Sequence, residues 1–290
     1  MKRRLAILIP AGALLILAAW LFAERRTSIG EGGPTVPRAP FEPTWSNRPV
    51  LLLGLGDSVT AGFGARNRYS YFDRLVANPP DEFPSMRDIN LRRVLPGLQA
   101  RNFAVNGSTS DQHAERIDAL ERADPATLGI VVLTTGGNDL IHNYGRSSPK
   151  PSAMYGATIA QARPWIEAFE QRLDAMFTSL ENRFPGGCHI FIATIYDPTD
   201  GVGDIEVTGL PPWPDGLAIL ASCNAAIARA AARHASAHVV DVRREFLGHG
   251  FHHGLSAHWY DSNIEDPNER GYDAIRRLML IEIARVLGTP

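Results

Sequence analysis

The feature that most constrains the fold is a repeated alternation of short apolar runs with longer helical patterns. The apolar runs are β-branched or leucine-rich and short enough to be single strands; they are Pro49–Leu55, Gln99–Val105, Gly129–Thr135, Cys188–Ile195 and Ala237–Val242. Strands that are apolar throughout are typical of parallel sheets, because helices cover both faces of such a sheet. The runs therefore predict buried parallel strands.

The stretches between these runs follow helical spacing. In the clearest one, apolar residues recur three and four positions apart and so share one face: Trp165, Phe169, Leu173, Met176, Phe177 and Leu180. An alanine-rich stretch, Leu217–Ala235, and a last stretch that contains Ile275, Met279 and Ile283 show the same pattern. Strand and helix thus alternate, which predicts a three-layer α/β/α sandwich with a mostly parallel sheet of about five strands.

The N-terminal residues 1–26 read as a membrane anchor or signal segment. Lys2–Arg4 precede an uncharged run, Leu5–Ala23, which would be roughly 28 Å long as a helix. A cleavage site needs small residues at its outer position, whereas cuts after the alanines of this run place Leu17 or Leu21 there. We therefore favour an uncleaved anchor, and the preceding positive cluster predicts that the rest of the chain lies outside the cytoplasm.

The next segment, residues 27–48, is rich in Pro and Gly and has no periodic apolar pattern, so it is predicted to be a linker. The folded domain is then predicted over residues 49–290. With 29 Lys+Arg against 31 Asp+Glu the net charge is 29 − 31 = −2, which gives no basic surface for nucleic acid. The two cysteines, Cys188 and Cys223, are too few for a disulfide framework, and the sequence leaves open whether they pair.

Unusual residues follow the predicted strands, where ligands bind in parallel sheets. Gly56-Asp57-Ser58 follows the first strand, Asn106-Gly107 the second, and Gly136-Gly137-Asn138-Asp139 the third. A histidine-rich loop over residues 249–261 follows the last strand. A serine, glycine and amide groups, and histidines are thus expected to converge at one edge of the sheet.

These three blocks, in this order, resemble those of the SGNH (GDSL-type) hydrolases, and the similarity runs from about Val50 to Leu287. The resemblance implies a flavodoxin-like fold, ester hydrolysis, and Ser58 as the nucleophile. It also implies an oxyanion hole made by the N–H groups of Ser58 and Gly107 and by the side-chain amide of Asn138. These roles fit the chemistry, since glycine lets a backbone N–H approach the substrate and N–H donors stabilise developing negative charge.

Taken singly, each of these residues has an ordinary structural alternative. A serine before a helix is commonly an N-cap, and Gly and Asn are common in turns. A phosphate-binding loop at Gly54-Leu55-Gly56 is excluded, because Val59 stands where the third glycine belongs. The three blocks together favour the catalytic interpretation.

The resemblance fails at the last block, where the family has Asp-x-x-His-Pro-Asn-x-x-Gly and uses the His as base. Aligned on Pro267 and Asn268, this chain has Asn263 at the acid position and Asp266 at the base position. An ordinary carboxylate is a weak base for a serine hydroxyl at neutral pH. We therefore expect a displaced base, His258, oriented by Asp266 or Asp261.

The other histidines of the loop remain alternatives to His258, with His253 as the second choice and His249 and His252 after it. A metal site built from His249, His252, His253 and Asp261 is a further alternative. Because the serine and the oxyanion donors account for the pocket, we expect no metal and no other cofactor.

The substrate is weakly constrained. A long Gly- and Pro-rich loop, Tyr196–Trp213, follows the fourth strand, and such loops commonly set specificity. The aromatic residues near the predicted site either contact substrate or pin the loops; they are Trp213, Tyr196, Trp259 and Tyr260. The sequence predicts a membrane-tethered, extracytoplasmic serine ester hydrolase for an acetylated carbohydrate, a lipid or a small ester. The alternatives are a catalytically silent glycan-binding module and an acyltransferase that uses the same residues.

Overall fold

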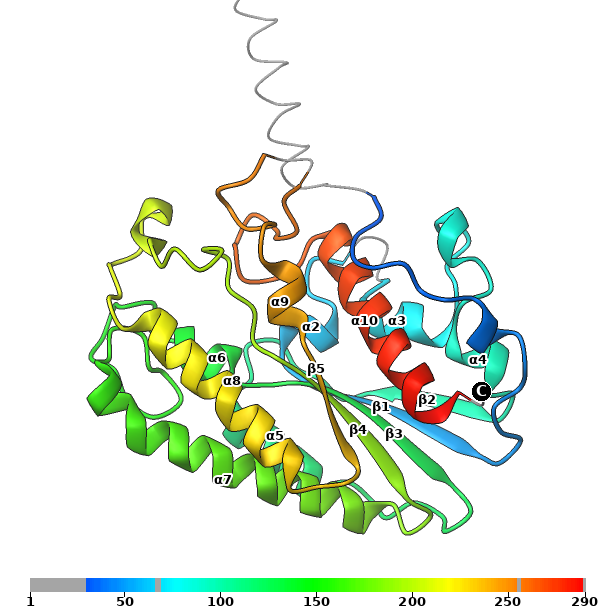
Figure 1. The fold of residues 1–290 in the computed structure, drawn as a ribbon. Helices are drawn as coiled ribbons and strands as arrows, with labels where there is room; N and C mark the ends of the chain where they lie inside the picture. Colours follow the sequence, from blue (N-terminus) through cyan, green and yellow to red (C-terminus); the bar gives the residue numbers. More distant parts are fainter. Residues whose placement is uncertain (1–29, 66–68, 255–256, 289–290) are drawn as a thin grey trace, which may run out of the picture.

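The sheet has five strands, all parallel, in the order β2-β1-β3-β4-β5 (Figure 1). The structure is a computed structural model that describes residues 30–65, 69–254 and 257–288. The strands are β1 (Val50–Gly56), β2 (Leu98–Asn102), β3 (Leu128–Thr134), β4 (Cys188–Ala193) and β5 (Ala237–Val240). Each lies within a predicted run or within one residue of it, so the predicted α/β sandwich is confirmed.

Three long helices and several short ones flank the sheet. The long helices are α7 (Ile159–Arg183), α8 (Gly216–Ala232) and α10 (Glu269–Leu287). The shorter ones are α2 (Ser58–Ala61), α3 (Tyr71–Val76), α4 (Leu91–Val94), α5 (Ser110–Asp118), α6 (Gly137–Ile141) and α9 (Val242–Phe246). Short 3₁₀ turns are η1 (Ala39–Phe41), η3 (Pro84–Met86) and η4 (Ile205–Thr208). Two of the long helices begin at side-chain caps: the Thr158 side chain accepts from Gln161 N at α7, and the Asn268 side chain accepts from Arg270 N at α10.

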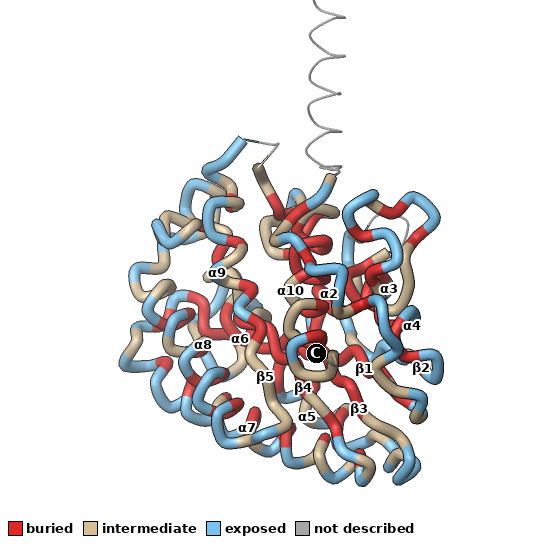
Figure 2. Tube along the Cα trace, turned by 45° about the vertical axis from the view of Figure 1, so that its right-hand side comes forward, coloured by how far each residue is buried: buried red, intermediate tan, exposed pale blue. Residues whose placement is uncertain are grey.

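Two apolar cores lie on opposite faces of the sheet. One face carries α5, α7 and α8, which bury Leu53 and Leu55 of β1. The other carries α3, α4, α9 and α10, which bury Leu52 of the same strand. Alternate residues of one strand thus enter different cores, as the pleat requires, and buried residues follow the strands and the inner faces of the helices (Figure 2). Cys188 and Cys223 both lie in the first core as free thiols.

Residues 30–48, in the predicted linker, lie against the domain. Val36 and Phe41 are buried in the core under α10, and Gly32 N donates to Asp273 of that helix at 3.1 Å. Trp45 N donates to the Val94 carbonyl at 2.8 Å. The isolated apolar side chains of this segment are buried on the domain, so residues 30–48 differ from a free tether.

The predicted membrane segment, residues 1–26, lies outside the described residues. Among the helices that the structure does describe, none is long and apolar enough to cross a bilayer.

A buried ion network joins α10 to the loop before η3. The Arg276 guanidinium is completely buried; its Nη1 lies 2.5 Å from Glu82 Oε2, and its Nη2 bonds Asp273. Removing one partner from such a network leaves a buried charge without compensation.

We therefore expect Arg276→Ala to lower the free energy of unfolding by about 3–5 kcal/mol, measured by urea denaturation. The matched control is Arg285→Ala on the same helix, where an exposed pair with Glu282 should contribute about 0–1 kcal/mol. Equal losses of unfolding free energy in the two variants would contradict the expected difference between the buried and the exposed ion pair.

Candidate active site

Ser58 begins helix α2 directly after β1, at the carboxyl edge of the sheet. Gly56 has φ +121°, and a Cβ there would lie 2.0 Å from the Thr134 carbonyl oxygen, so this turn requires glycine. Asp57 caps α2: its Oδ1 accepts from Val59 N at 3.1 Å and from Thr134 Oγ1 at 2.7 Å. Burial raises the pKa of the Asp57 carboxyl to about 6. The close packing of Gly56 and the hydrogen bonds of Asp57 thus fix the turn, and the turn presents the partly exposed Ser58 to the pocket.

The loop after β2 carries Gly107 and is attached to the same turn. Val105 N donates to the Gly56 carbonyl at 2.9 Å, and Ser108 Oγ donates to it at 3.1 Å. Gly107 has φ +73°, and beyond its chain neighbours no heavy atom of the described structure lies within 4 Å of where its Cβ would be. The space beside this backbone is therefore open, as expected of an oxyanion donor that approaches a substrate closely.

Asn138 lies in α6, immediately after β3, and faces the Gly107 loop. Its Nδ2 donates to the Ser108 carbonyl at 2.9 Å, and its side chain lines the same pocket as Ser58. Asp139, the next residue, is buried and accepts from Ser110 N at 2.9 Å, so it ties the start of α5, which follows the second block, to the third block.

His113 is a buried residue behind the Gly107 loop that sequence reasoning missed. Its Nε2 lies 2.7 Å from Ser108 Oγ and its Nδ1 lies 2.7 Å from Thr135 Oγ1. Burial, with a smaller effect from Arg116, lowers the pKa of His113 to about 4, so the ring is neutral at pH 7. The sequence signal that could have identified His113 as buried is its position four residues before Ile117, on the same buried face of α5.

Three of the four loop histidines are held by partners away from Ser58. His249 stacks on Trp259 with ring centroids 3.5 Å apart and bonds the Ala257 carbonyl at 2.6 Å. His252 Nε2 lies 2.9 Å from Asp204 Oδ1, and His253 Nε2 lies 3.3 Å from Asp200 Oδ2. In the described part of the chain no three His, Cys, Asp or Glu residues are grouped to hold a metal ion.

His258, the expected base, packs edge-on against Tyr260 with ring centroids 5.8 Å apart. Neither His258 nor Asp266 is among the residues that line the pocket of Ser58 and Asn138, so the lining does not choose between them. The role of His258 as base stays a prediction.

Asp266 lies beside the nucleophile. It is buried, its Oδ2 accepts from Asn263 Nδ2 at 2.6 Å, and a hydrogen-bonding interaction with the Ser58 side chain acts on the same carboxylate. Burial and the Asp261 charge raise the pKa of Asp266, and the Ser58 and Asn263 interactions lower it; burial is the largest effect and the pKa is raised. The structure thus brings Ser58, Asn138 and Asp266 together.

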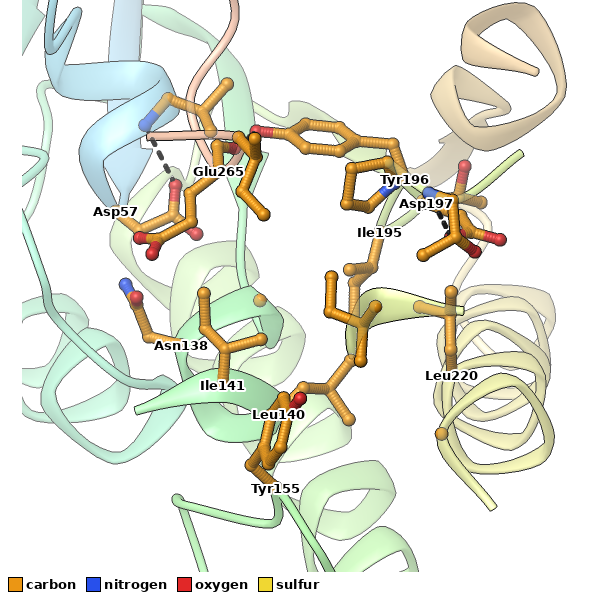
Figure 3. A pocket seen from close by; sticks show the side chains of 18 of the residues that line it. Asp57, Asn138, Leu140, Ile141, Tyr155, Ile195, Tyr196, Asp197, Leu220 and Glu265 are labelled. Carbon is orange, nitrogen blue, oxygen red and sulfur yellow. Dashed lines mark hydrogen bonds between the residues drawn. The ribbon is translucent and has the colours of Figure 1, made fainter. Parts of the chain in front are cut away.

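The pocket carries Asp57, Asn138 and Glu265 on one side and Asp197 on another, and most of its surface is apolar (Figure 3). Its apolar walls come from α6, α8, the end of β4 and the following loop; among them are Leu140, Ile141, Tyr155, Ile195, Leu217 and Leu220. Glu265, which sequence reasoning also missed, accepts from Tyr144 Oη at 2.8 Å.

The four aromatic residues divide into two pairs. Tyr196 and Trp213 line the pocket and also pin its loop, because Tyr196 Oη bonds the Glu265 carbonyl and Trp213 Nε1 bonds the Ala157 carbonyl at 2.9 Å. Trp259 and Tyr260 are buried against Phe246 and belong to the core. The loop from Tyr196 to Trp213 thus contributes several residues to the lining of the pocket.

Comparison with solved structures places this fold among esterases and lipases. An acetylxylan esterase from Geobacillus stearothermophilus is 15% identical with a TM-score of 0.56, over 82% of this chain and 95% of the other. An extracellular lipase from Streptomyces rimosus is 21% identical with a TM-score of 0.57, over 80% of this chain and 99% of the other. A phospholipase A1 from Streptomyces albidoflavus is 17% identical with a TM-score of 0.52, over 82% of this chain and 100% of the other.

A search of curated proteins finds no match. The GDSL-like Lipase/Acylhydrolase family matches residues 55–274, which include all three sequence blocks and Asp266. The chain therefore belongs to the GDSL-like Lipase/Acylhydrolase family and is a hydrolase of ester bonds.

Proposed function

We propose that the protein is a serine esterase that acts through an acyl-enzyme on Ser58 and takes esters of short apolar acids. The observation that carries the proposal is that Ser58 and Asn138 line one mostly apolar cavity. An ester whose acyl chain fills the apolar part would place its carbonyl carbon at the hydroxyl of Ser58.

The reaction begins when Ser58 Oγ attacks the ester carbonyl carbon and loses its proton to a nearby base. The carbonyl oxygen becomes negatively charged and is stabilised by the N–H groups of Ser58 and Gly107 and by the Asn138 amide. The alcohol then leaves with a proton, which forms the acyl-enzyme. Water attacks this ester by the same route, which releases the acid and restores Ser58.

The size of the cavity limits the acyl group. Its volume is about 180 Å³. A dry apolar cavity of about 150 Å³ holds one benzene molecule, so a chain of roughly four to six carbons is expected to fit. The acetyl group would leave most of this space empty, whereas a long fatty acyl chain would have to extend out of it.

Hydrolysis of nitrophenyl esters of increasing chain length tests this proposal. We expect kcat/KM to be highest for the butanoate to hexanoate esters. Leu220→Phe, which fills part of the cavity, should lower kcat/KM for hexanoate by roughly 10- to 200-fold, the usual effect of one misfitting group, and should spare acetate. Leu247→Phe makes the same change at an exposed leucine and is the control. A flat chain-length profile that Leu220→Phe leaves unchanged would contradict the acyl pocket.

We further propose that residues 1–26 anchor the enzyme to a membrane and that the domain works outside the cytoplasm. The support is the uncharged run Leu5–Ala23 behind the positive cluster Lys2–Arg4. Because residues from 30 onward pack on the domain, few residues separate it from the proposed anchor. The full chain should sediment with membranes, resist extraction by salt, and be digested by protease added from the outer side. Release by salt alone would contradict the anchor.

A further inference from the structure

The pair Asn263 and Asp266 occupies the place at which the family has its orienting acid and its histidine base. The spacing is the same, three residues, and Pro267 and Asn268 follow as in the family block. Asn263 Nδ2 bonds Asp266 Oδ2 at 2.6 Å, so the first residue of the pair orients the second. The Asp266 carboxylate in turn interacts with the Ser58 side chain. The positions of the family relay are thus kept, although the chemical groups differ.

The backbone holds Asp266 firmly in this place. Asn263 Oδ1 accepts from the N–H groups of Glu265 and Asp266 at 3.2 and 3.1 Å, and Asp261 N donates to the Asp266 carbonyl at 2.7 Å. Ile264, at the tip of this turn, has φ +59°, an unfavourable conformation for a β-branched residue. Strain of this kind persists only where the surrounding contacts determine the conformation.

Asp266 Oδ1 is the free end of the carboxylate. It is buried and makes no hydrogen bond of ordinary geometry in the described structure, while Oδ2 is taken by Asn263. Catalytic hydrogen bonds are often long in an empty site and shorten when substrate binds. A buried carboxylate that interacts with the Ser58 side chain and keeps one oxygen outside its bond to Asn263 is suited to accept a proton.

We propose that Asp266 is the general base for Ser58 and that Asn263 orients it, so that a serine–aspartate–asparagine relay replaces the serine–histidine–aspartate relay. This inference rests on the proposed serine mechanism and names the base that it requires. Asp266 Oδ1 takes the proton as the bond from Ser58 Oγ to the carbonyl carbon forms. The resulting carboxylic acid gives that proton to the alcohol oxygen as the ester C–O bond breaks. In the second half Oδ1 takes a proton from water and returns it to Ser58 Oγ.

The surroundings of Asp266 favour a stronger base than an ordinary aspartate. Burial is the main cause of the raised pKa. Several acidic groups also interact with this carboxylate; they are Asp57 at the start of α2, Asp261 and Glu265 of its own loop, Tyr144 after α6, Tyr196 after β4 and Tyr272 of α10. A carboxylate with a raised pKa is a better match to the proton of a serine hydroxyl.

The pH profile of the unmodified full chain gives the first test, with a neutral nitrophenyl ester as substrate. The base must be deprotonated, so kcat/KM falls as the pH drops through its pKa. With Asp266 as base this acid limb lies above the ordinary 3.8 of an aspartate. An acid limb at or below 3.8, or one that His258→Gln removes, would overturn the proposal.

Variants give the second test. Asp266→Asn keeps the shape and should lower kcat by about 10²- to 10⁴-fold, the usual contribution of a general base. Asp81→Asn makes the same change at an exposed aspartate and serves as the control. The double variant Asn263→Asp/Asp266→His rebuilds the family block; it should recover activity over Asp266→Asn and move the acid limb to about 6.5.

The results that would refute Asp266 as the base differ from those that would refute Ser58 as the nucleophile. If Asp266→Asn keeps full activity while Ser58→Ala and His258→Gln both lose it, the base is the imidazole of His258 and the proposal is wrong. If Ser58→Ala itself stays active, the serine mechanism fails instead. A folded Asp266→Asn variant with lost activity, together with the moved acid limb of the double variant, supports Asp266.

Discussion

Replacing Ser58 by alanine should lower kcat for ester hydrolysis on the order of 10⁴-fold or more. The hydroxyl is the group that forms the acyl-enzyme, and no adjacent residue of α2 can take its place. Only slow attack by water, assisted by the oxyanion donors, would remain. The measurement is the rate of nitrophenyl butanoate hydrolysis by the full chain at several substrate concentrations.

The matched control is Ser222→Ala, which removes an exposed hydroxyl on α8 that bonds only the Ala218 carbonyl in the described structure. This variant should keep its kcat. Circular dichroism and thermal unfolding should be alike for both variants, since Ser58 is partly exposed and is not the residue that caps its helix. Full activity in folded Ser58→Ala would exclude the serine mechanism.

The second large effect is expected at Asn138. Asn138→Ala removes a donor to the oxyanion and should lower kcat about 10²- to 10³-fold while KM changes little, because the negative charge develops only in the transition state. Steady-state kinetics with a neutral ester separate the two parameters. A loss that appeared in KM alone would show that Asn138 binds the ground state.

Asn138 also fixes the Ser108 carbonyl, so the loss of this bond needs its own control. Asn143→Ala removes an amide that orders the neighbouring loop by bonding the Ala153 and Tyr155 carbonyls. If ordering of loops accounted for the effect, both variants would lose similar activity. We expect a much larger loss at Asn138.

The sheet and the first three blocks could be predicted because their signals are local. Apolar runs such as Gly129–Thr135 fit only a buried strand, and the turns that follow require particular residues, as Gly56 does beside Thr134. In a parallel sheet the carboxyl ends of the strands share one edge, so Ser58, Gly107 and Asn138 had to lie near one another. Their convergence follows from topology.

The choice of base could not be predicted in the same way, because the basicity of a carboxylate depends on its burial as well as on residue type. An aspartate with its ordinary pKa is a poor base, so the sequence predicts His258 from its place in a histidine-rich loop, and that role stays a prediction. The structure shows that Asp266 is desolvated beside Ser58, a property that one sequence cannot reveal. The packing of Val36 and Phe41 was missed for a similar reason, since two isolated apolar residues carry no periodic signal.

Labelling with a serine-directed fluorophosphonate tests the central claim most directly. The full chain is treated with the probe, digested, and mapped by peptide mass. We predict one adduct per chain, on Ser58, formed at a rate that Ser222→Ala leaves unchanged and absent from Ser58→Ala. A folded protein that acquires no adduct, or that carries it on another residue, would contradict an activated Ser58 nucleophile.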